Sequence, residues 1–596
     1  MPFSAQFQVG FQAPKICIER QCLFFYSIIC LCYSKLTLNM MLSSSTNPMQ
    51  MMKYIFVTGG VISGLGKGIT ASSIGRLLKS RGLEVTAIKI DPYLNIDAGT
   101  MNPFEHGEVY VLDDGGEVDL DLGNYERFLD ISLSSDHNIT TGKVYKSVIE
   151  KERAGDFLGK TVQIIPHITN EITSRIKSVA ESTGADVCIV ELGGTVGDIE
   201  SMPFLEAARQ MGSELGKGTN CIFVHTTLVP VMGSVGEQKT KPTQHSVKEL
   251  RSIGIQPDII VARSKEPLDY SIRKKISLFC DVPIEAVVSA ADANSIYEIP
   301  IVLEEQGITD YLLKKMDLPS KCKDLTAWRE YLDRILYPMN SVKIALVGKY
   351  TNLADSYLSH LEAFHHASAE LGTQIDCLFF DSEKIEQDGI PKDLANVDGI
   401  LIPGGFGNRG VNGKILTAKF ARENNIPFLG VCLGFQVATM EIARHLAHLE
   451  DANSTEFDPH TKHPVVDLLP DQINVVDKGA TMRLGAQKVL ITEGSQAEEL
   501  YGALEISERH RHRYEVNPDY IDKLEAVGWK FTGRSEDGVK MEIGELTDHP
   551  FFMASQFHPE FKSRPSKPSP LHLGLLKAAV VRRQRLADRN LHLPSD

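Results

Sequence analysis

The chain reads Phe428-Leu429-Gly430-Val431-Cys432-Leu433-Gly434-Phe435-Gln436, which predicts a short buried strand, a sharp turn at Cys432 and a helix over 437–444. Gly430 and Gly434 stand two residues to either side of Cys432, where a side chain would clash with the neighbouring strand or helix. The turn lifts the sulfur above the end of a sheet and beside a helix N-terminus, whose partial positive charge favours the reactive thiolate. The pattern indicates a cysteine nucleophile at a strand–helix elbow.

Two further segments supply what such a nucleophile needs. His558 and Glu560 are two positions apart, so on an extended strand they share a face, and Glu560 can hold the imidazole while His558 exchanges protons with Cys432. The glycine-rich run at 403–410 follows an apolar run at 399–402, and its backbone N–H groups can approach a developing oxyanion. Taken alone, each segment has a plainer interpretation: a packing cysteine, a surface His-x-Glu pair and an ordinary turn. Together, and in this order, they resemble the triad-type glutamine amidotransferase domain, which releases ammonia from glutamine.

Length and composition indicate a multidomain globular protein. The 596 residues suggest several domains, and 42% hydrophobic and 23% charged residues are ordinary values. A net charge of −15 argues against a protein that wraps nucleic acid, although phosphorylated small substrates need only local positive charge. Ten cysteines without a CxxC pair favour a reduced, intracellular protein, and we expect a cytoplasmic one.

Residues 1–52 differ from the rest of the chain. They hold four of the ten cysteines and an apolar run at 22–33, which is too short to span a bilayer. With Lys15 and Arg20 before it, the run loosely resembles a signal peptide, but a small-residue cleavage site is not convincing. We therefore expect a disordered or spurious extension.

A phosphate-binding loop is predicted where the globular part begins. A buried strand at 54–58, a glycine-rich run at 59–68 and a helix at 69–79 form a cradle in which backbone N–H groups face phosphates and Lys67 reaches them. The match to the strict P-loop is incomplete, because Val61 occupies the first glycine position and Gly68 replaces the Ser or Thr that holds magnesium. Carboxylates elsewhere should then hold the metal.

Acidic residues follow two further predicted strands. The strand at 86–90 leads to an acidic stretch at 113–123, in which Asp119 and Asp121 alternate with leucines and so should share one face. The strand at 186–192 carries Glu191 near its end. Carboxylates at the ends of parallel strands lie where ligands bind, and hard oxygen ligands suit magnesium on nucleotide phosphates. The alternative for the acidic stretch is a solvated loop.

A basic run lies between predicted strands at 221–229 and 258–263. It reads Gln238-Lys239-Thr240-Lys241-Pro242-Thr243-Gln244-His245-Ser246. Two lysines, two threonines and a glutamine in a loop can bind a triphosphate and hydrogen-bond a base. The plainer interpretation is a basic surface loop.

The motifs of residues 53–318 together resemble the synthetase half of the CTP synthase family. They are Gly-Leu-Gly-Lys-Gly (64–68), Lys-Ile-Asp-Pro-Tyr-Leu-Asn (89–95), Asp-Leu-Asp-Leu-Gly-Asn-Tyr-Glu-Arg-Phe (119–128), Glu-Leu-Gly-Gly-Thr-Val-Gly-Asp-Ile-Glu (191–200) and Lys-Thr-Lys-Pro-Thr-Gln-His-Ser (239–246). The family's glutaminase half follows, with Gly-Val-Cys-Leu-Gly-Phe-Gln (430–436), Asn-Ser-Thr-Glu-Phe (453–457), Arg-His-Arg-His-Arg-Tyr-Glu-Val-Asn (509–517) and Gln-Phe-His-Pro-Glu-Phe (556–561). The resemblance extends from Lys53 to about Ala579.

The resemblance implies two doubly wound α/β domains with mostly parallel sheets. We expect a P-loop-like synthetase domain at 53–318, a linker at 319–341, a flavodoxin-like glutaminase domain at 342–565 and a tail at 566–596 that ends in a helix. The family makes CTP from UTP, ATP and glutamine: ATP phosphorylates O4 of the uracil ring, and ammonia that arrives through an internal tunnel displaces the phosphate. Also implied are Mg²⁺, inhibition by CTP, activation by GTP near the loop at 481–485, and a homotetramer built as a dimer of dimers. Neither a nucleic acid nor a membrane is an expected partner.

Motif by motif, the resemblance implies a role for each candidate residue. ATP should contact Ser63, Gly64, Leu65, Gly66, Lys67, Gly68, Lys89 and Asp121, and the metal should be held by Asp121 and Glu191, with Asp119 nearby. UTP and inhibitory CTP should contact Ser63, Asp198, Ile199, Glu200, Lys239, Thr240, Lys241, Pro242, Thr243, Gln244 and Lys275. Glutamine should contact Gly405, Leu433, Gly434, Phe435, Gln436, Glu456 and Arg513, and the chemistry should fall to Cys432, His558 and Glu560.

Two alternatives remain open at this point. Another ligase with the same halves, such as a cobyrinic-acid-type amidase or a purine-pathway amidotransferase, is opposed by the runs at 198–200 and 239–246. An inactive scaffold that keeps the fold is opposed by the presence of every expected catalytic residue.

Overall fold

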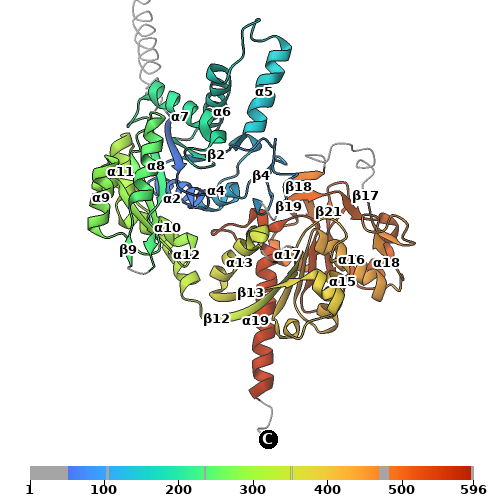
Figure 1. Cartoon of the computed structure of the whole chain (residues 1–596). Helices are drawn as coiled ribbons and strands as arrows, with labels where there is room; N and C mark the ends of the chain where they lie inside the picture. Colours follow the sequence, from blue (N-terminus) through green and yellow to red (C-terminus); the bar gives the residue numbers. More distant parts are fainter. Residues whose placement is uncertain are drawn as a thin grey trace, which may run out of the picture. The chain divides into compact units, whose positions relative to one another are not determined.

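The computed structural model describes residues 52–102, 106–233, 236–349, 351, 353–468 and 482–591 (Figure 1). The expected extension at 1–52 lies outside the described residues except for Met52, and so does Thr481 of the loop expected to serve GTP. No helix within the described ranges is both long and apolar enough to cross a bilayer.

A seven-stranded sheet organises the first half of the chain, coloured blue to green in Figure 1. Its order is β11-β10-β7-β1-β6-β2-β5, and every neighbouring pair is parallel. The strands are mostly apolar and buried on both faces, as parallel strands covered by helices must be. They are β1 (Lys53–Gly59), β2 (Val85–Asp91), β5 (Asn138–Thr140), β6 (Val187–Leu192), β7 (Cys221–Leu228), β10 (Ile259–Ser264) and β11 (Val287–Ala291).

Helices cover both faces of this sheet. Alternate residues of β1 enter different cores: Ile55 and Val57 pack with α2, α4 and α10–α12, whereas Tyr54 and Phe56 pack with α5, α6 and α7. A third cluster joins α8 and α9 to β10 and β11. The helices are α2 (Lys67–Ser80), α4 (Asp121–Leu129), α5 (Thr141–Ala154), α6 (Thr169–Thr183), α7 (Met202–Leu215), α8 (Lys241–Ser252), α9 (Tyr270–Cys280), α10 (Ile299–Glu305), α11 (Ile308–Met316) and α12 (Thr326–Leu336).

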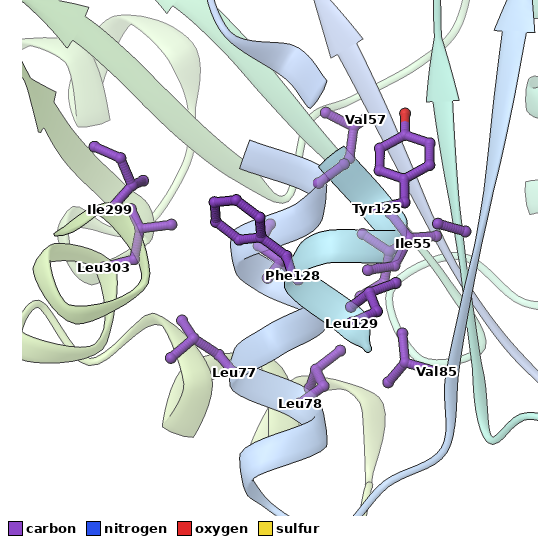
Figure 2. Close-up of a cluster of buried hydrophobic side chains, with 14 of the residues drawn as sticks. Ile55, Val57, Leu77, Leu78, Val85, Tyr125, Phe128, Leu129, Ile299 and Leu303 are labelled. Atoms are coloured by element: carbon purple, nitrogen blue, oxygen red, sulfur yellow. The ribbon is translucent and has the colours of Figure 1, made fainter. Parts of the chain in front are cut away.

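The helix after the phosphate loop is held by the first of these cores. Figure 2 shows Leu77 and Leu78 of α2 beside Phe128 and Leu129 of α4, and all four side chains are fully buried. Burying one such side chain stabilises the fold by roughly 1.5–3 kcal/mol. The loop before α2 is therefore carried by a rigid support.

A nine-stranded sheet organises the second half. Its order is β13-β12-β14-β15-β23-β22-β21-β18-β19; the pairs from β13 to β23 are parallel and the remaining pairs antiparallel. The strands are β12 (Asn340–Gly348), β13 (Thr373–Asp381), β14 (Gly399–Ile402), β15 (Phe428–Val431), β18 (Arg483–Ile491), β19 (Glu505–His512), β21 (Trp529–Ser535), β22 (Met541–Leu546) and β23 (Phe552–Ser555). With helices on both faces, each half has the predicted α/β fold.

Two layers of helices enclose the second sheet. One core contains residues of α14, α15, α16 and α18, and the other contains residues of α13, α17 and α19. The tail is helical, as predicted, and it has a packing role: Leu571, Leu575 and Ala579 are fully buried against the sheet. The helices are α13 (Leu358–Leu371), α14 (Ser382–Asp388), α15 (Val411–Glu423), α16 (Leu433–His445), α17 (Gln496–Tyr501), α18 (Ile521–Ala526) and α19 (Pro570–Leu591).

Short strands and the segment between the halves complete the chain. The segment expected as a linker contains α12, whose Trp328 and Tyr331 are buried in the core of the first half. The short strands are β3 (Tyr110–Val111), β4 (Glu117–Val118), β8 (Val231–Met232), β9 (Glu237–Gln238), β16 (Asn453–Ser454), β17 (Pro464–Leu468) and β20 (Tyr514–Val516).

The loop expected at 481–485 is wrong at 483–485, which begin β18. Three further local expectations are wrong, each because a helix begins where extended or loop structure was expected. The carboxylate of Asp119 accepts the N–H of Asp121 (2.9 Å) at the start of α4, so these residues are not an alternating strand. Pro242 lies in the first turn of α8, so 241–244 form a helix N-terminus instead of a loop. Pro559 likewise opens a short 3-10 helix, η10 (Pro559–Lys562), so His558 and Glu560 do not share a strand.

Candidate active sites

The elbow at Cys432 has the predicted strand–turn–helix form. β15 ends at Val431, Cys432 adopts φ 54° and ψ −103°, and α16 begins at Leu433. A positive φ is strained for a residue with a side chain, and the N–H of Cys432 is held by the carbonyl of Ser555 (2.7 Å). A Cβ on Gly434 would clash with the carbonyl oxygen of Ile402, which explains the glycine there.

His558 and Glu560 meet although they do not lie on a strand. The Nδ1 of His558 lies 2.6 Å from Oε1 of Glu560 in a buried site. Burial opposes the charge of His558, but Glu560 and the sulfur of Cys432 outweigh it and raise the pKa of the imidazole to about 10. Burial also opposes the charge of Glu560, and the imidazoles of His360 and His558 outweigh it, lowering the pKa of the carboxyl to about 2. The arrangement favours an imidazolium held between a sulfur and a carboxylate.

Gly404 borders both the imidazole and the elbow. A Cβ there would lie 3.0 Å from Cε1 of His558 and 3.5 Å from Cβ of Cys432, so both side chains border this glycine. The Nε2 of His558 has no hydrogen-bond partner within the described part of the chain, which leaves it available to the nucleophile.

Two lysines that the sequence prediction missed hold the glycine-rich run. The buried Nζ of Lys414 donates to the carbonyl of Pro403 (3.1 Å), and the Nζ of Lys349 donates to the carbonyl of Phe406 (2.9 Å). Burial lowers the pKa of Lys349 to about 8 and that of Lys414 well below its usual range. A lysine on the apolar face of α15 was the available signal for Lys414.

The residues expected to bind glutamine divide into two groups. Gly405 and Arg513 line the cavity at Cys432, and Glu456 accepts the N–H of Gly407 beside it (2.8 Å). Phe435 packs in the apolar core with Trp529, and Gln436 donates to the carbonyl of Tyr514 (3.1 Å). The second group, whose members are Leu433, Gly434, Phe435 and Gln436, therefore builds the start of α16.

A cavity of about 530 Å³ opens at the sulfur and is lined from both halves. The second half contributes Cys432, His558, Glu560 and the run at 403–406. The first half contributes a loop at 99–102 together with Glu108 and Val109. Sequence reasoning had assigned none of these first-half residues, because their approach to the second half depends on long-range packing.

In the first half, Asp121 explains the unusual phosphate loop. A Cβ at Gly68 would clash with the carboxylate of Asp121. The glycine that stands where a strict P-loop has Ser or Thr therefore leaves room for that carboxylate. Gly64 and Gly66 adopt positive φ at 72° and 80°, whereas Ser63 is exposed. The Nζ of Lys67 donates to the carbonyl of Gly194 (2.9 Å), and burial lowers the pKa of Lys67. Leu65 is buried and supports the loop.

Carboxylates from three segments converge on Lys89. Its Nζ contacts Asp121 and lies 3.1 Å from Glu191 and 3.8 Å from Asp91. Burial opposes its charge, but the carboxylates of Asp121, Glu191, Asp119 and Asp91 outweigh it and hold the pKa of Lys89 well above the usual range. Tyr125, which the sequence reasoning did not single out, donates to Glu191.

The donor set around Lys89 is compatible with magnesium. Asp121 and Glu191 supply hard oxygens from two segments, and Mg²⁺ is commonly held by one or two carboxylates plus substrate phosphates. Among the described residues, no three His, Cys, Asp or Glu side chains form a metal-binding group of their own. The carboxylates of Asp121 and Glu191 therefore fit part of a magnesium site.

The residues expected to bind UTP and CTP are less uniform. Thr243 is buried and donates to the carbonyl of Leu228 (3.0 Å), so it supports the loop instead of facing a ligand. Thr240 accepts from Gln244 (3.0 Å), and both stand at the start of α8 with Lys239, Lys241 and Pro242. Asp198 accepts the N–H of Thr195 (2.9 Å) and, like Ile199 and Glu200, is exposed. Lys275 is exposed on α9, where its charge acts on Glu237 of β9.

A buried ion network joins the two halves. Glu126 of α4 accepts from both terminal nitrogens of Arg509 (2.8 and 3.0 Å) and from Arg564 (2.7 Å). Glu126 and Arg509 have no exposed surface, and the backbone carbonyl of Arg509 accepts the N–H of His558 (2.8 Å). The helix that carries Asp121 thus contacts the segment that carries the imidazole.

Comparisons with known proteins identify the family of each half. Residues 53–318 match the family model described as CTP synthase N-terminus, and residues 352–578 match glutamine amidotransferase class-I. A CTP synthase of Methanosarcina acetivorans is 60% identical over 528 residues, which cover 88% of this chain and 98% of that protein. A CTP synthase of Thermococcus kodakarensis is 60% identical over 530 residues, or 89% of this chain and 99% of that protein.

One solved structure, described as the glutaminase domain of Trypanosoma brucei CTPS with bound acivicin, is 42% identical and covers 40% of this chain and 94% of its own, with a TM-score of 0.38. The family models and the full-length relatives together span the described halves. The chain therefore belongs to the CTP synthase family of glutamine-hydrolysing, ATP-dependent ligases.

Proposed function

We propose that this chain converts UTP to CTP, using ATP and the amide nitrogen of glutamine. The observation that carries the proposal is the cavity at Cys432, which is lined from both halves of the chain. One half holds a cysteine elbow with its imidazole and carboxylate, and the other holds a phosphate loop beside a carboxylate cluster.

In the second half, Cys432 is the proposed nucleophile. Its thiolate attacks the amide carbon of glutamine, and His558 gives a proton to the departing nitrogen, which leaves as ammonia. Water, deprotonated by His558, then hydrolyses the glutamyl thioester to glutamate. Glu560 holds the imidazole, and backbone N–H groups of the run at 403–410 stabilise the oxyanion. Gly405, Glu456 and Arg513 are the proposed glutamine contacts.

In the first half, the O4 of UTP attacks the γ-phosphorus of ATP, giving ADP and a 4-phosphorylated UTP. Ammonia then adds at C4, and phosphate departs to leave CTP. Lys67 and Lys89 are the proposed cations that stabilise the transferred charge. Asp121 and Glu191 would hold Mg²⁺, which would neutralise phosphate charge when bound. The start of α8 and the exposed residues 198–200 are the proposed UTP and CTP contacts.

Direct transfer of ammonia between the halves is part of the proposal. Near pH 7 free ammonia is mostly ammonium, which is not a nucleophile, so release into water would waste it. The cavity at Cys432 reaches Val109 and the loop at 99–102 of the first half, which supports an internal passage.

Regulation and assembly are proposed from the family resemblance. We propose GTP activation, CTP inhibition and a tetramer built as a dimer of dimers. We also propose two domains, a synthetase at 53–318 and a glutaminase at 342–565. The helix α12 lies between them in sequence and packs against the synthetase, and α19 follows the glutaminase and packs against it.

The first experiment measures CTP formation from UTP, ATP and Mg²⁺ by wild type and Cys432→Ala, each supplied with glutamine or with ammonium. The variant should lose the glutamine-driven reaction by at least roughly 10³-fold, because its nucleophile is gone, and keep the ammonium-driven one. Glutamine-driven synthesis by the variant would disprove the triad. No CTP from wild type with ammonium would disprove the substrate assignment, and ATP hydrolysis that does not depend on UTP would favour a different ligase.

A further inference from the structure

Two buried histidines continue the catalytic set beyond Glu560. His360 of α13 places Nε2 3.4 Å from Oε1 of Glu560, and its Nδ1 lies 3.1 Å from Nε2 of His572 of α19. The Nδ1 of His572 lies 2.8 Å from the hydroxyl of Ser569. His360 is 4% exposed and borders the cavity at Cys432, and His572 is fully buried, so these contacts are largely shielded from water.

The order of donors along this row follows from the acceptor at its end. A carboxylate only accepts, so a neutral His360 serves Glu560 by carrying its proton on Nε2. Its Nδ1 must then accept, which places the proton of His572 on Nε2, and the Nδ1 of His572 must accept from Ser569. Burial favours the neutral form of both imidazoles, since it lowers the pKa of His360 and lowers that of His572 to about 3.

The carboxylate of Glu560 depends on these histidines because one of its two oxygens lacks a hydrogen-bond partner among the described residues. Oε1 of Glu560 faces both His558 and His360, whereas its buried Oε2 has no hydrogen-bond partner among the described residues. The charged and titratable groups around it are the two histidines, His558, and the more distant Glu108, Glu508 and Tyr501, whose own ionisation Glu560 opposes. Among the described residues, the groups that lower the pKa of Glu560 most are the imidazoles of His360 and His558.

We propose that His360 and His572 are positioning residues for the glutaminase reaction, which hold the Glu560 carboxylate in the orientation that keeps the His558 imidazole aimed at Cys432. Neither histidine touches the sulfur. They act by fixing which oxygen of Glu560 faces His558, in the way that outer groups orient the ligands of a metal site. This inference rests on the proposed glutamine hydrolysis and adds two helices, α13 and α19, to its machinery.

The test compares His360→Leu and His572→Leu with the rescue variant His360→Gln, whose amide N–H reaches the place of Nε2. His366→Leu is the matched control: His366 is fully buried on the same helix but contacts Ser563 and Tyr297 instead of Glu560. For each protein, glutamine hydrolysis, ammonium-driven CTP synthesis and the pH profile of Cys432 alkylation by iodoacetamide are measured.

The leucine variants should lose roughly tenfold in kcat for glutamine with KM within about twofold, and ammonium-driven synthesis should be unchanged. Their alkylation profile should move to higher pH, because a loosely held Glu560 supports the imidazolium less well. His360→Gln should recover most of both losses, and His366→Leu should show neither. Equal kcat and pH profiles in His360→Leu and His366→Leu would overturn the proposal.

Failure of the proposed function would look different. If wild type did not hydrolyse glutamine, the alkylation profile would still report the Cys432–His558 pair without substrate. A profile that does not change in either leucine variant would overturn the positioning role, whatever the activity. A leucine variant that does not fold would lose the ammonium-driven reaction too. The proposal would then be decided on His360→Gln alone. Its alkylation profile should match that of wild type and differ from that of Glu560→Gln.

Discussion

At the scale of single residues, the proposed glutaminase site depends on a charge arrangement that burial opposes. His558 and Glu560 are both removed from water, which costs each ion several kcal/mol. Each offsets the cost for the other, and the sulfur of Cys432 adds to the stabilisation of the imidazolium. Such a pair is stable only while both partners are charged, which makes the site sensitive to pH.

We expect that sensitivity to appear in the thermal midpoint. The pKa of Glu560 is lowered to about 2 from 4.5, so its stabilisation is present above pH 4.5 and lost as the pH falls through 2. The pKa of His558 is raised to about 10 from 6.5, so its stabilisation is present below pH 6.5 and lost as the pH rises through 10. Both contributions are complete between pH 4.5 and 6.5.

Wild type should therefore exceed Glu560→Gln in Tm by a few degrees near pH 6, and the gap should narrow towards pH 10. Differential scanning calorimetry at pH 6, 8 and 10 measures it. Asp537→Asn, at an exposed turn, serves as the control and should show a small gap that does not change over this range. A constant gap for Glu560→Gln would show that the pair is not ionised as described.

At the scale of elements, α4 serves both halves at once. Its first residue, Asp121, faces Lys89 and the phosphate loop, and its Tyr125 binds Glu191. One residue further on, Glu126 binds Arg509 and Arg564 of the second half. A shift of this helix would move the carboxylate cluster and the backbone next to His558 together.

Removing one charge from this network should be costly. Glu126→Gln removes the buried counter-ion of Arg564 and leaves Arg509 only its pair with the partly exposed Asp113 among the described residues. A broken buried pair destabilises by about 3–5 kcal/mol. We expect glutamine-driven CTP synthesis to fall more than ammonium-driven synthesis, because the contact between the halves loosens first. Parallel assays with the two nitrogen sources measure the ratio.

Glu214→Gln provides the comparison, since Glu214 forms an exposed pair with Lys177 (2.7 Å) and should have little effect. Equal losses with glutamine and ammonium in Glu126→Gln would mean that the network supports only general stability.

At the scale of the whole molecule, two halves built on sheets of different design line one cavity. The seven-stranded parallel sheet presents a phosphate loop at the end of β1, and the nine-stranded sheet presents Cys432 at the end of β15. Both positions are the carboxyl ends of parallel strands, where α/β proteins bind ligands. Residues from both halves line the space at the sulfur.

Filling that space from the first half should uncouple the two reactions. Val109 lines the cavity and is 8% exposed, so Val109→Phe adds a ring where little room exists. Glutamine hydrolysis should continue within about threefold, while the amount of CTP formed per glutamate should fall several-fold. Simultaneous measurement of glutamate and CTP tests this. Val539→Phe, at an exposed position, should leave the ratio unchanged.

Local patterns predicted the parts of the molecule that depend on neighbours in sequence. The elbow could be predicted from Gly430, Cys432 and Gly434 between an apolar run and a helix. The strands could be predicted from their apolar runs alone. The alternation of acidic and apolar residues around Asp121 gave a wrong prediction of extended structure. The carboxylate of Asp119 accepts the N–H of Asp121, and a side chain bound to nearby backbone in this way favours the start of a helix over a strand.

Contacts between distant segments could not be predicted in this way. Glu126 and Arg509 are 383 positions apart, and His360 and His572 are 212 apart. No local pattern marks such partners, since their meeting depends on how complete sheets and helices pack. The buried Lys414 left only a weak signal, a charge on the apolar face of a helix.

His558, Glu560 and α19 all follow the entire first half along the chain. During translation the N-terminal part of a protein emerges from the ribosome and folds first. A nascent chain thus has its complete phosphate loop and carboxylate cluster before the imidazole and its carboxylate have been synthesised. Under the proposed transfer of ammonia, the half that consumes ammonia is therefore synthesised before the half that produces it.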